Sequence, residues 1–475
     1  TLQKDILSLQ AMYGDLGYAF ANPIPRTRVI EKERKIEITY EIDKGQKVYI
    51  GEINVTGNSK TRDKVVRREL KIREGELYNE TRKRESIANV KRLGFFDTVS
   101  FNTSTPEDNP SQLDIDIVVK ERNTGTIQVG AGYSTYSGFV FNGQVKQTNL
   151  LGRGQNLGVS LNLSDKESLF NLNFTEPYFM DTEWSVGVDA YQSNTDKIVY
   201  NQIKRGGAVR VGHPLAPYLN GYIRYKLDDT ELELNPDEGD PAVYPVSTAN
   251  GTTSSLTFTL TYDKRNDRFA PTEGAFANAS FEYAGLGGDK KYNKGGLNLR
   301  YYKDLFWNVV WRNNITFGVL NANDPGAPYP DNEPPFNERF LLGGANTLRG
   351  YQFFTIGKRV RSQIAFDKAR SDGYTVAESE VKAMRPFGGK QQFYYNLEFQ
   401  FPLIDEAGIM GVMFYDIGDA QDVIDFDNLR SNYGFGFRWF SPIGPLRFEW
   451  GFPIGRQEEL DESPMNFQFA IGTPF

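Results

Sequence analysis

Alternation between apolar and polar residues dominates the chain from residue 123 to its end. In residues 157–163 every second position is Leu or Val, and the positions between them are Gly, Ser and Asn. The same spacing recurs in residues 127–133, 170–174, 184–190, 256–262, 277–283 and 467–471. A period of two is typical of β-strands that bury one face. Helical periodicity is almost absent here, so we predict one large antiparallel sheet over residues 123–475.

Three features of this region favour a membrane barrel over a soluble sandwich, which would also alternate. The polar positions hold mainly small neutral residues, aromatic pairs such as Tyr178-Phe179 stand at strand ends, and short turns contrast with long acidic connections such as 228–253. Lipid does not tolerate an open sheet edge, so the sheet must close. At roughly 22 residues per strand and connection, we predict a transmembrane antiparallel β-barrel of about 16 strands, with its apolar face outward.

Residues 1–122 combine helical and strand periodicity and contain an internal repeat. Leu16-Gly17-Tyr18 corresponds to Leu93-Gly94-Phe95, and the alternating residues 36–42 correspond to residues 113–119 at the same offset. Residues 46–122 are predicted to form a complete β-α-α-β-β module, with strands at 48–55, 97–102 and 113–120 and helices at 61–72 and 80–93. Residues 1–45 are predicted to be a partial module without its opening strand and helix. Such modules either bind extended segments at their sheet edges or act as spacers.

Composition and charge narrow the functional classes. The 475-residue chain has no Cys and one His, His213, which argues against thiol chemistry, a His-based triad or a His metal cluster. Apolar segments fall short of the about 20 residues of a membrane-spanning helix, and the opening residues do not resemble an export signal, which predicts a mature or truncated form. Residues 1–122 carry 22 Lys+Arg and 20 Asp+Glu, whereas residues 123–475 carry 32 and 41. We therefore expect a boundary near residue 123, no nucleic-acid partner, no cofactor and no enzymatic activity.

Residues 320–390 form a segment with little sustained alternation, far longer than an ordinary connection between strands. Its glycines stand beside large apolar residues, a composition that favours packing over disorder. A single cation occupies the motif Leu348-Arg349-Gly350-Tyr351. Arg349 is either a solvated turn residue or a buried one. If buried, it needs a carboxylate with fork-like geometry, which lysine would replace poorly.

Several motifs together carry a resemblance to a known family. They are residues 149–154 (NLLGRG), 174–178 (FTEPY), 262–274 (YDKRNDRFAPTEG), 348–351 (LRGY), 414–419 (FYDIGD) and 467–475 (FQFAIGTPF). With the preceding repeats, they resemble the BamA family of outer-membrane-protein assembly factors, which combine POTRA modules with a transmembrane β-barrel. A full-length member would carry about five such modules, so the chain is expected to be truncated at its N-terminus. The resemblance also implies that the loop 320–390 enters the barrel lumen, where Arg349 would meet Asp416, with Glu449 as a further candidate partner.

The resemblance implies a place in the outer membrane of a Gram-negative bacterium, with the POTRA modules in the periplasm. The implied function is that of the core subunit of a machinery that folds and inserts outer membrane proteins. The expected partners are unfolded outer membrane protein substrates, accessory outer-membrane lipoproteins, periplasmic chaperones and the lipid bilayer.

The first and last barrel strands are predicted to meet at a weak lateral seam. Glycine weakens strand pairing in the first strand, and a terminal glycine and proline shorten the last. The expected seam residues are Gly125, Ile127, Gln128, Val129 and Gly130 on the first strand, and Phe467, Phe469, Ile471, Gly472 and Phe475 on the last. An incoming precursor would pair with the opened edge by β-augmentation. Cysteines at positions 128 and 469, if close enough to bridge, would lock the seam.

Three other functions remain as alternatives. A two-partner secretion or autotransporter assembly pore would pass its substrate to the outside instead of integrating it. A passive porin would show steady large conductance, although the long plugging loop argues against this function. A surface enzyme would need a nucleophile and a base close together, and no plausible pair stands out in the sequence.

Overall fold

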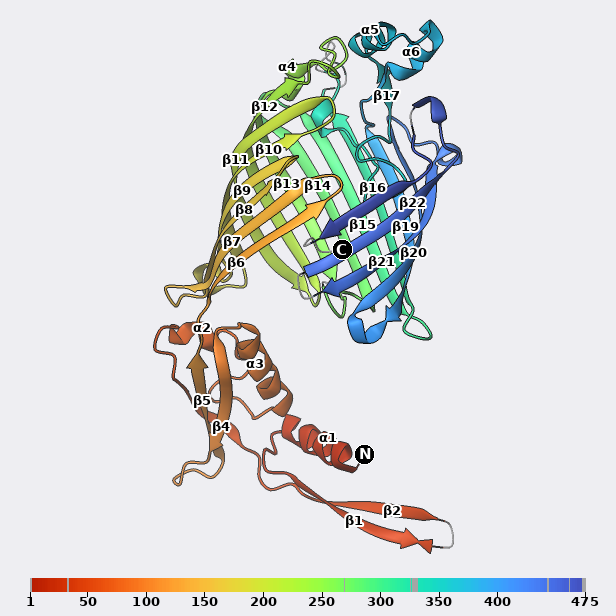
Figure 1. The fold of residues 1–475 in the computed structure, drawn as a ribbon. Helices are drawn as coiled ribbons and strands as arrows, with labels where there is room; N and C mark the ends of the chain where they lie inside the picture. The colour runs from red at the N-terminus through yellow and green to blue at the C-terminus, as the bar shows by residue number, and fades with distance from the viewer. Residues whose placement is uncertain are drawn as a thin grey trace. The chain divides into compact units, whose positions relative to one another are not determined.

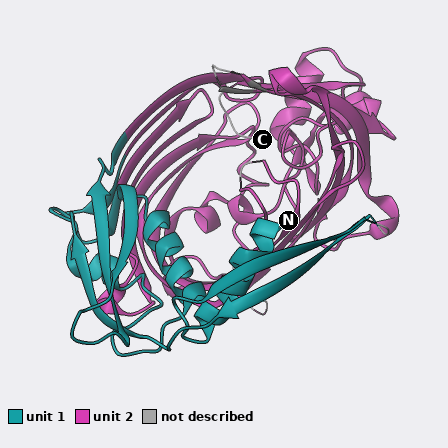
Figure 2. Cartoon of the chain, turned by 90° about the horizontal axis from the view of Figure 1, so that it is seen from below, with its two compact units in different colours: residues 1–126, 146–157 teal, residues 127–145, 158–475 magenta. Residues whose placement is uncertain are grey.

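The computed structural model describes residues 2–31, 34–268, 270–324, 326, 332–441, 444–460 and 462–471. The chain divides into two compact units, residues 1–126 with 146–157 and residues 127–145 with 158–475 (Figure 2). In the described part of the chain, none of the helices combines the length and apolar character needed to cross a membrane.

The first unit contains a complete β-α-α-β-β module. Its elements are β3 (Tyr49–Thr56), α2 (Asp63–Arg67), α3 (Glu80–Arg92), β4 (Phe96–Ser104) and β5 (Gln112–Glu121) (Figure 1). The sheet order is β3-β5-β4, with β3 parallel and β4 antiparallel to β5. One face of this sheet packs on both helices through a core that includes Val65, Val90, Ile115 and Ile117.

The first helix of the module is shorter than predicted. We expected a helix over residues 61–72, whereas α2 spans only Asp63–Arg67. The N–H groups of Glu69 and Leu70 donate to carbonyls three residues back, at 3.1 Å each, so the chain tightens into a turn. Two adjacent β-branched residues, Val65 and Val66, give this short segment a low intrinsic helix propensity.

The partial module consists of α1 (Leu2–Asp15), β1 (Asn22–Ile30) and β2 (Lys35–Asp43). A module that lacks only its opening strand and helix still has two strands, of which the sequence located only the second; β1 contains Pro23 and Pro25. It nevertheless pairs antiparallel with β2 from Asn22↔Asp43 to Ile30↔Lys35. The sheet has two strands, so both strands are edges, where a missing proline N–H is tolerated.

In the second unit, consecutive strands close into a barrel of sixteen strands (Figure 1). The strands are β6 (Gly125–Ser134), β7 (Gly138–Leu150), β8 (Gln155–Ser164), β9 (Glu167–Glu176), β10 (Ser185–Asp196), β11 (Tyr200–Ala216), β12 (Leu219–Leu234), β13 (Gly251–Asp263), β14 (Gly274–Gly288), β15 (Tyr292–Asp304), β16 (Val310–Ala322), β19 (Gln391–Ile404), β20 (Ile409–Gln421), β21 (Arg430–Ser441), β22 (Gly444–Ile454) and β23 (Asn466–Ile471). The described strand pairs from β9 to β23 and on to β6 are antiparallel. The predicted fold class is therefore confirmed.

The barrel wall exposes apolar side chains and buries charged ones, the reverse of a soluble sheet. On β14, Phe281 and Tyr283 are 49% and 39% exposed, while Glu282 between them points to the opposite face. On the inner face, Glu449 and Asp416 are completely buried. An exterior of this kind suits lipid, and the interior must satisfy its own polar groups.

The segment between β16 and β19 is more regular than its sequence suggested. It contains a 3-10 turn (Phe336–Glu338), β17 (Arg359–Arg361), α5 (Gln363–Ser371), α6 (Val376–Lys382) and β18 (Met384–Pro386). We did not predict its helices, although α6 has a signature that the sequence displays. Thr375 caps its first turn and Glu378 reaches back to the Thr375 N–H, forming a capping box. A further short helix, α4 (Val246–Ala249), lies between β12 and β13.

Replacing the buried Ile117 with alanine is expected to destabilise the complete POTRA-like module by about 2–5 kcal/mol, because the surrounding core relaxes only partly around the cavity. Ile117 is 0% exposed, whereas the adjacent Val118 is 41% exposed and provides the matched control. Hydrogen exchange of β3, β4 and β5 in the intact chain measures the effect. Faster exchange in Val118→Ala than in Ile117→Ala would contradict this account of the core.

Candidate functional site: a buried arginine network in the barrel

The loop residues around Arg349 are folded into a compact turn. Leu342 and Ile356 exchange backbone hydrogen bonds of 2.9 and 3.0 Å, and both pack with Leu348 and Tyr351 in one buried cluster. Within the turn, the Gly344 N–H lies 3.1 Å from the carbonyl of Leu348 and 3.0 Å from that of Tyr351. The backbone that carries Arg349 is thus fixed on both sides before the arginine meets the barrel wall.

Arg349 is 4% exposed and binds two carboxylates from the wall. Its Nε and Nη2 donate to the two oxygens of Asp416 on β20, at 2.9 and 2.7 Å. Its Nη1 donates to Glu398 on β19 at 2.7 Å. The guanidinium carbon also lies 3.6 Å from the centre of the Phe414 ring. All three nitrogens of the planar group thus donate to carboxylates, two of them as a fork on Asp416, and one face lies on an aromatic ring. An ammonium group lacks this combination of contacts.

Asp416 is satisfied by neutral donors as well as by the arginine. The side-chain amides of Asn396 and Asn432 donate to its oxygens at 2.8 and 3.0 Å, and the Arg349 backbone N–H donates at 3.1 Å. A completely buried carboxylate needs this full set of donors, because each lone pair left without one costs desolvation energy.

Two glycines let the loop backbone lie directly against the wall. A Cβ atom on Gly350 would lie 2.5 Å from the Cβ of Asn432, and one on Gly451 of β22 would lie 2.7 Å from the carbonyl of Arg349. Both distances are too short for real atoms, so any side chain at either position would push the loop away. Glycine at position 350 of the LRGY motif therefore serves close approach.

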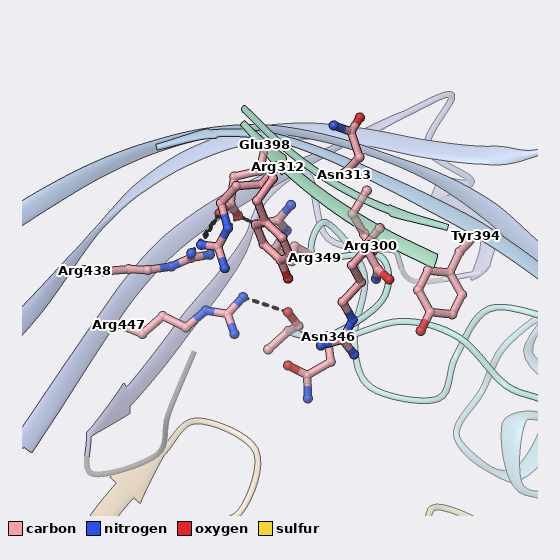
Figure 3. A pocket seen from close by; sticks show the side chains of 13 residues that line it. Arg300, Arg312, Asn313, Asn346, Arg349, Tyr394, Glu398, Arg438 and Arg447 are labelled. Atoms are coloured by element: carbon pink, nitrogen blue, oxygen red, sulfur yellow. Dashed lines mark hydrogen bonds and ion pairs between the residues drawn. The ribbon is translucent and has the colours of Figure 1, made fainter. Parts of the chain in front are cut away.

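Glu449 is less directly connected to Arg349 than we expected. Its Oε2 lies 3.7 Å from Arg349 Nη1, whereas it accepts bonds of 2.7 Å from Arg438 and 2.6 Å from Arg447. Glu398 is the nearer second carboxylate, and it also accepts two bonds from Arg438 at 2.8 and 2.7 Å (Figure 3).

Sequence reasoning missed Glu398, Arg438, Arg447, Asn396 and Asn432. The sequence could have indicated Glu398, because it occupies one of the alternate positions of β19 that face inward, and its neighbours on that face are neutral and polar. The sequence does not say which cations face it, because they come from strands and loops far away along the chain.

A second buried ion cluster holds the start of the same loop. Glu338 accepts bonds from Lys204 of β11 at 2.8 Å and Lys294 of β15 at 3.0 Å. Burial opposes ionisation of this carboxyl, but the two ammonium groups hold its pKa well below the usual range. The loop is thus attached to the wall by charge at two separate places.

The first and last strands are paired at two positions in the described residues, Ala470↔Ser134 and Ile471↔Tyr133. By comparison, β22 and β23 are paired from Leu446↔Ile471 to Gly451↔Asn466. The Thr135 N–H donates to the carbonyl of Phe469 at 3.0 Å, which places Thr135 opposite Phe469. Gln128 therefore does not lie opposite Phe469, and the condition for a bridge between positions 128 and 469 is not met. Residues opposite each other in a sheet share a face, and these two have opposite parity.

The predicted seam residues are distributed as follows. Gly125, Ile127, Gln128, Val129 and Gly130 belong to β6 and lie before the paired positions; Phe467, Phe469 and Ile471 belong to β23; and Gly472 and Phe475 lie outside the described residues. Ile127 and Val129 are 77% and 71% exposed.

The loop contacts the last strand at this junction and the turn that follows the first strand. The side-chain amide of Asn466, at the start of β23, donates to the carbonyls of Arg349 and Tyr351 at 3.1 and 2.8 Å. Phe353 stacks on Tyr136, in the turn after β6, with ring centres 4.1 Å apart. The arginine motif and its flank thus touch the last strand and the hairpin that begins with the first.

Two family models match the chain. The POTRA model, described as a surface antigen variable number repeat, matches residues 48–122. The Omp85 superfamily domain matches residues 149–475, more than half of the chain. The chain belongs to the Omp85 superfamily. It is a bacterial outer-membrane β-barrel preceded by POTRA structure, and the resemblance inferred from its motifs is confirmed.

Individual relatives place this Omp85 chain beside assembly factors. It is 30% identical to outer membrane protein assembly factor BamA of Nitratidesulfovibrio vulgaris over 100% of the chain and 57% of that protein. It is 26% identical to BamA of Neisseria meningitidis over 98% of the chain and 62% of that protein. The chain therefore spans about three fifths of the length of these curated relatives. These relatives are named as assembly factors, and this similarity supports the expectation that the chain is not an enzyme.

Solved structures show the same architecture. The crystal structure of BamA from Haemophilus ducreyi lacking POTRA domains 1–3 superposes with a TM-score of 0.79 at 25% identity, covering 100% of this Omp85 chain and 93% of the other. CdiB from Acinetobacter baumannii gives a TM-score of 0.56 at 12% identity, covering 99% and 81%. At that identity, the likeness to CdiB is one of fold.

Replacing Arg349 with alanine is expected to lower the stability of the barrel by about 3–5 kcal/mol, because it leaves buried carboxylates without their cation. Arg349→Lys keeps the charge but not the fork, and should resemble alanine more than the parent. The temperature at which the folded form is lost in semi-native electrophoresis measures the effect.

Arg361 provides a matched control in the same loop. It also forms a two-pronged ion pair, with Glu380 at 2.6 and 3.2 Å, but its side chain is 39% exposed. Arg361→Ala should cost far less than Arg349→Ala, because solvent screens an exposed ion pair. Equal losses in Arg349→Ala and Arg361→Ala would show that burial of the Arg349 network is not what stabilises the loop.

Proposed function

We propose that the chain is part of an assembly factor that folds outer membrane proteins and inserts them through a lateral seam between β6 and β23. The observation that carries this proposal is the short pairing at that junction: two described positions join β23 to β6. Elsewhere the wall is far more extensively paired, as between β11 and β12 from Tyr200↔Leu234 to Ala216↔Leu219. Each backbone hydrogen bond adds about 0.5–1.5 kcal/mol, so the proposal places the opening where the described pairing is shortest.

The part of β6 before Tyr133 supports the proposed templating of an incoming strand. Residues before Tyr133 have no partner in the described part of β23, and Gln128 is as open to solvent as its apolar neighbours. A row of free backbone donors and acceptors binds an extended segment by main-chain hydrogen bonds, with little demand on sequence. Alternating apolar residues on the segment would meet lipid beside Ile127 and Val129.

The substrates and partners follow from this proposal. Unfolded outer membrane proteins are the proposed substrates, delivered by periplasmic chaperones, and accessory outer-membrane lipoproteins are the proposed partners within the complex. Strand β4 lies at an edge of the module sheet, in the order β3-β5-β4, so the module can receive an extended substrate segment by β-augmentation.

A disulfide across the junction tests the seam. Ser134→Cys with Ala470→Cys joins residues directly opposite each other, at a separation that disulfide geometry accepts. The chain has no cysteine of its own, so these would be its sole thiols. Oxidised protein in lipid vesicles is expected to lose insertion of an added barrel precursor, and a reductant should restore it.

Two further pairs sharpen the test. Ala208→Cys with Lys226→Cys bridges β11 and β12 at two residues that lie opposite each other. This bridge should leave insertion unchanged. Gln128→Cys with Phe469→Cys should fail to bridge. Full insertion by the oxidised 134/470 protein would refute the seam. Release of the precursor across the membrane, without integration, would favour the secretion-pore alternative.

A further inference from the structure

A cavity of about 400 Å³ lies inside the barrel beside the Arg349 network. Its wall includes Arg300 from β15, Arg312 from β16, Arg438 from β21 and Arg447 from β22, and the loop contributes Asn346 (Figure 3). Figure 3 shows these side chains converging from the strands and the loop on one space. With so many arginines around one polar cavity, the question is which negative groups balance their positive charge.

The described carboxylates do not neutralise the cluster. Five arginines line the cavity, counting Arg349, whereas three carboxylates are bonded to them: Glu398, Asp416 and Glu449. Arg300 contributes to the surplus most clearly, since its described hydrogen bond is to the neutral amide of Asn298 at 2.9 Å. Among the described residues the cluster thus has two more guanidinium groups than carboxylates. Arg300 itself is exposed, whereas the other four arginines are buried or half-buried, where like charges repel more strongly than in water.

One donor at the cavity is buried and unused. The Nε–H of Arg447 has no hydrogen-bond partner among the described residues, and the Arg447 side chain is 10% exposed. The same side chain donates from Nη2 to Glu449 and to the carbonyl of Ala345, at 2.6 and 2.7 Å. A buried donor attached to a charged group is costly to leave unsatisfied, and the described residues do not supply its acceptor.

We propose that this cavity binds an oxyanion of the phosphate type that carries two negative charges. Guanidinium groups match phosphate oxygens with paired, charge-assisted hydrogen bonds, and a dianion balances the surplus charge. The anion would sit between the strand arginines and Asn346, and so would connect the wall to the loop. This inference rests on the charge and geometry of the cavity and is independent of the assembly function.

The cavity has a neighbour at the strand junction. Ala345, Asn346 and Arg447 also line a second cavity of about 180 Å³, together with Thr135, Gln468 and Phe469. An anion bound by Arg447 therefore lies one side chain away from the β6–β23 junction. The phosphate can be a free ion or the headgroup of a lipid, and the chemistry of recognition is the same for both.

Titration with inorganic phosphate tests the site. The whole chain is purified in a detergent with an uncharged headgroup, and phosphate is exchanged for chloride at constant ionic strength. Saturable binding by calorimetry, with a rise in unfolding temperature, is the expected result. Arg300→Gln should weaken binding about tenfold, as expected for loss of one charge-assisted contact. Because Arg300 has no described carboxylate partner, this variant leaves no buried carboxylate unpaired.

Two substitutions at Asn346 separate charge from shape. Asn346→Asp places a negative charge at the cavity and should also weaken binding about tenfold or more, whereas Asn346→Ser should change it little. The control for net charge is Arg205→Gln, because Arg205 is 56% exposed and pairs with Glu231, away from the cavity lining. It should bind phosphate like the parent.

The source of the anion is distinguished in lipid nanodiscs. Native mass spectrometry compares retention of phosphatidic acid with retention of phosphatidylcholine by the parent and by Arg300→Gln. Binding of inorganic phosphate in detergent identifies a free-ion site, and selective retention of phosphatidic acid by the parent alone identifies a lipid headgroup site. If neither occurs, or if Arg300→Gln and Asn346→Asp bind as tightly as Arg205→Gln, the proposal is wrong.

Discussion

The buried pairing of Arg349 with Asp416 and Glu398 is the constraint on which the barrel interior depends. Taking these charges out of water costs several kcal/mol per ion, and only close, multiply bonded geometry offsets that cost. The loop therefore has one acceptable position against the wall. Gly350 and Gly451 make that position sterically possible. The two asparagine side chains supply the remaining hydrogen bonds to the Asp416 carboxylate. A small displacement would lose several of these contacts together, so the loop is held cooperatively.

The same constraint explains how a barrel with an inward polar face acquires a packed interior. Most apolar side chains of the wall face outward, so the interior has only small apolar clusters, such as the one around Leu342, Leu348 and Tyr351. Ion pairs and hydrogen bonds between the wall and the long loop add to the order inside. The Arg349 and Glu338 clusters provide it at two places. Such networks tolerate few substitutions, since removing one partner leaves a buried charge on the other.

The fold class and most strands of this structure were predictable from local sequence patterns, whereas its long-range contacts were predictable only in part. Alternation revealed strands such as β14, and it fixes which face each residue occupies, but it does not fix register. Alternation alone could have shown that Gln128 and Phe469 lie on opposite faces of the sheet. Identifying Thr135 as the residue opposite Phe469 required the fold. Asp416 came from a family motif. Glu398 lies beside Arg349 because β19 and the loop meet in space, which no local pattern records.

The position of the arginine network relative to the junction determines what can move. The carboxylates that hold Arg349 stand on β19, β20 and β22, whereas the proposed seam lies between β23 and β6. Separation of β6 from β23 breaks two described pairs and leaves the network intact. Separation at β22 and β23 would break pairing from Leu446 to Gly451 and the bonds from Asn466 to the loop. In the proposed opening, separation on the β6 side would therefore break fewer of the described contacts, and β23 would stay on the wall beside the loop that the buried arginine anchors.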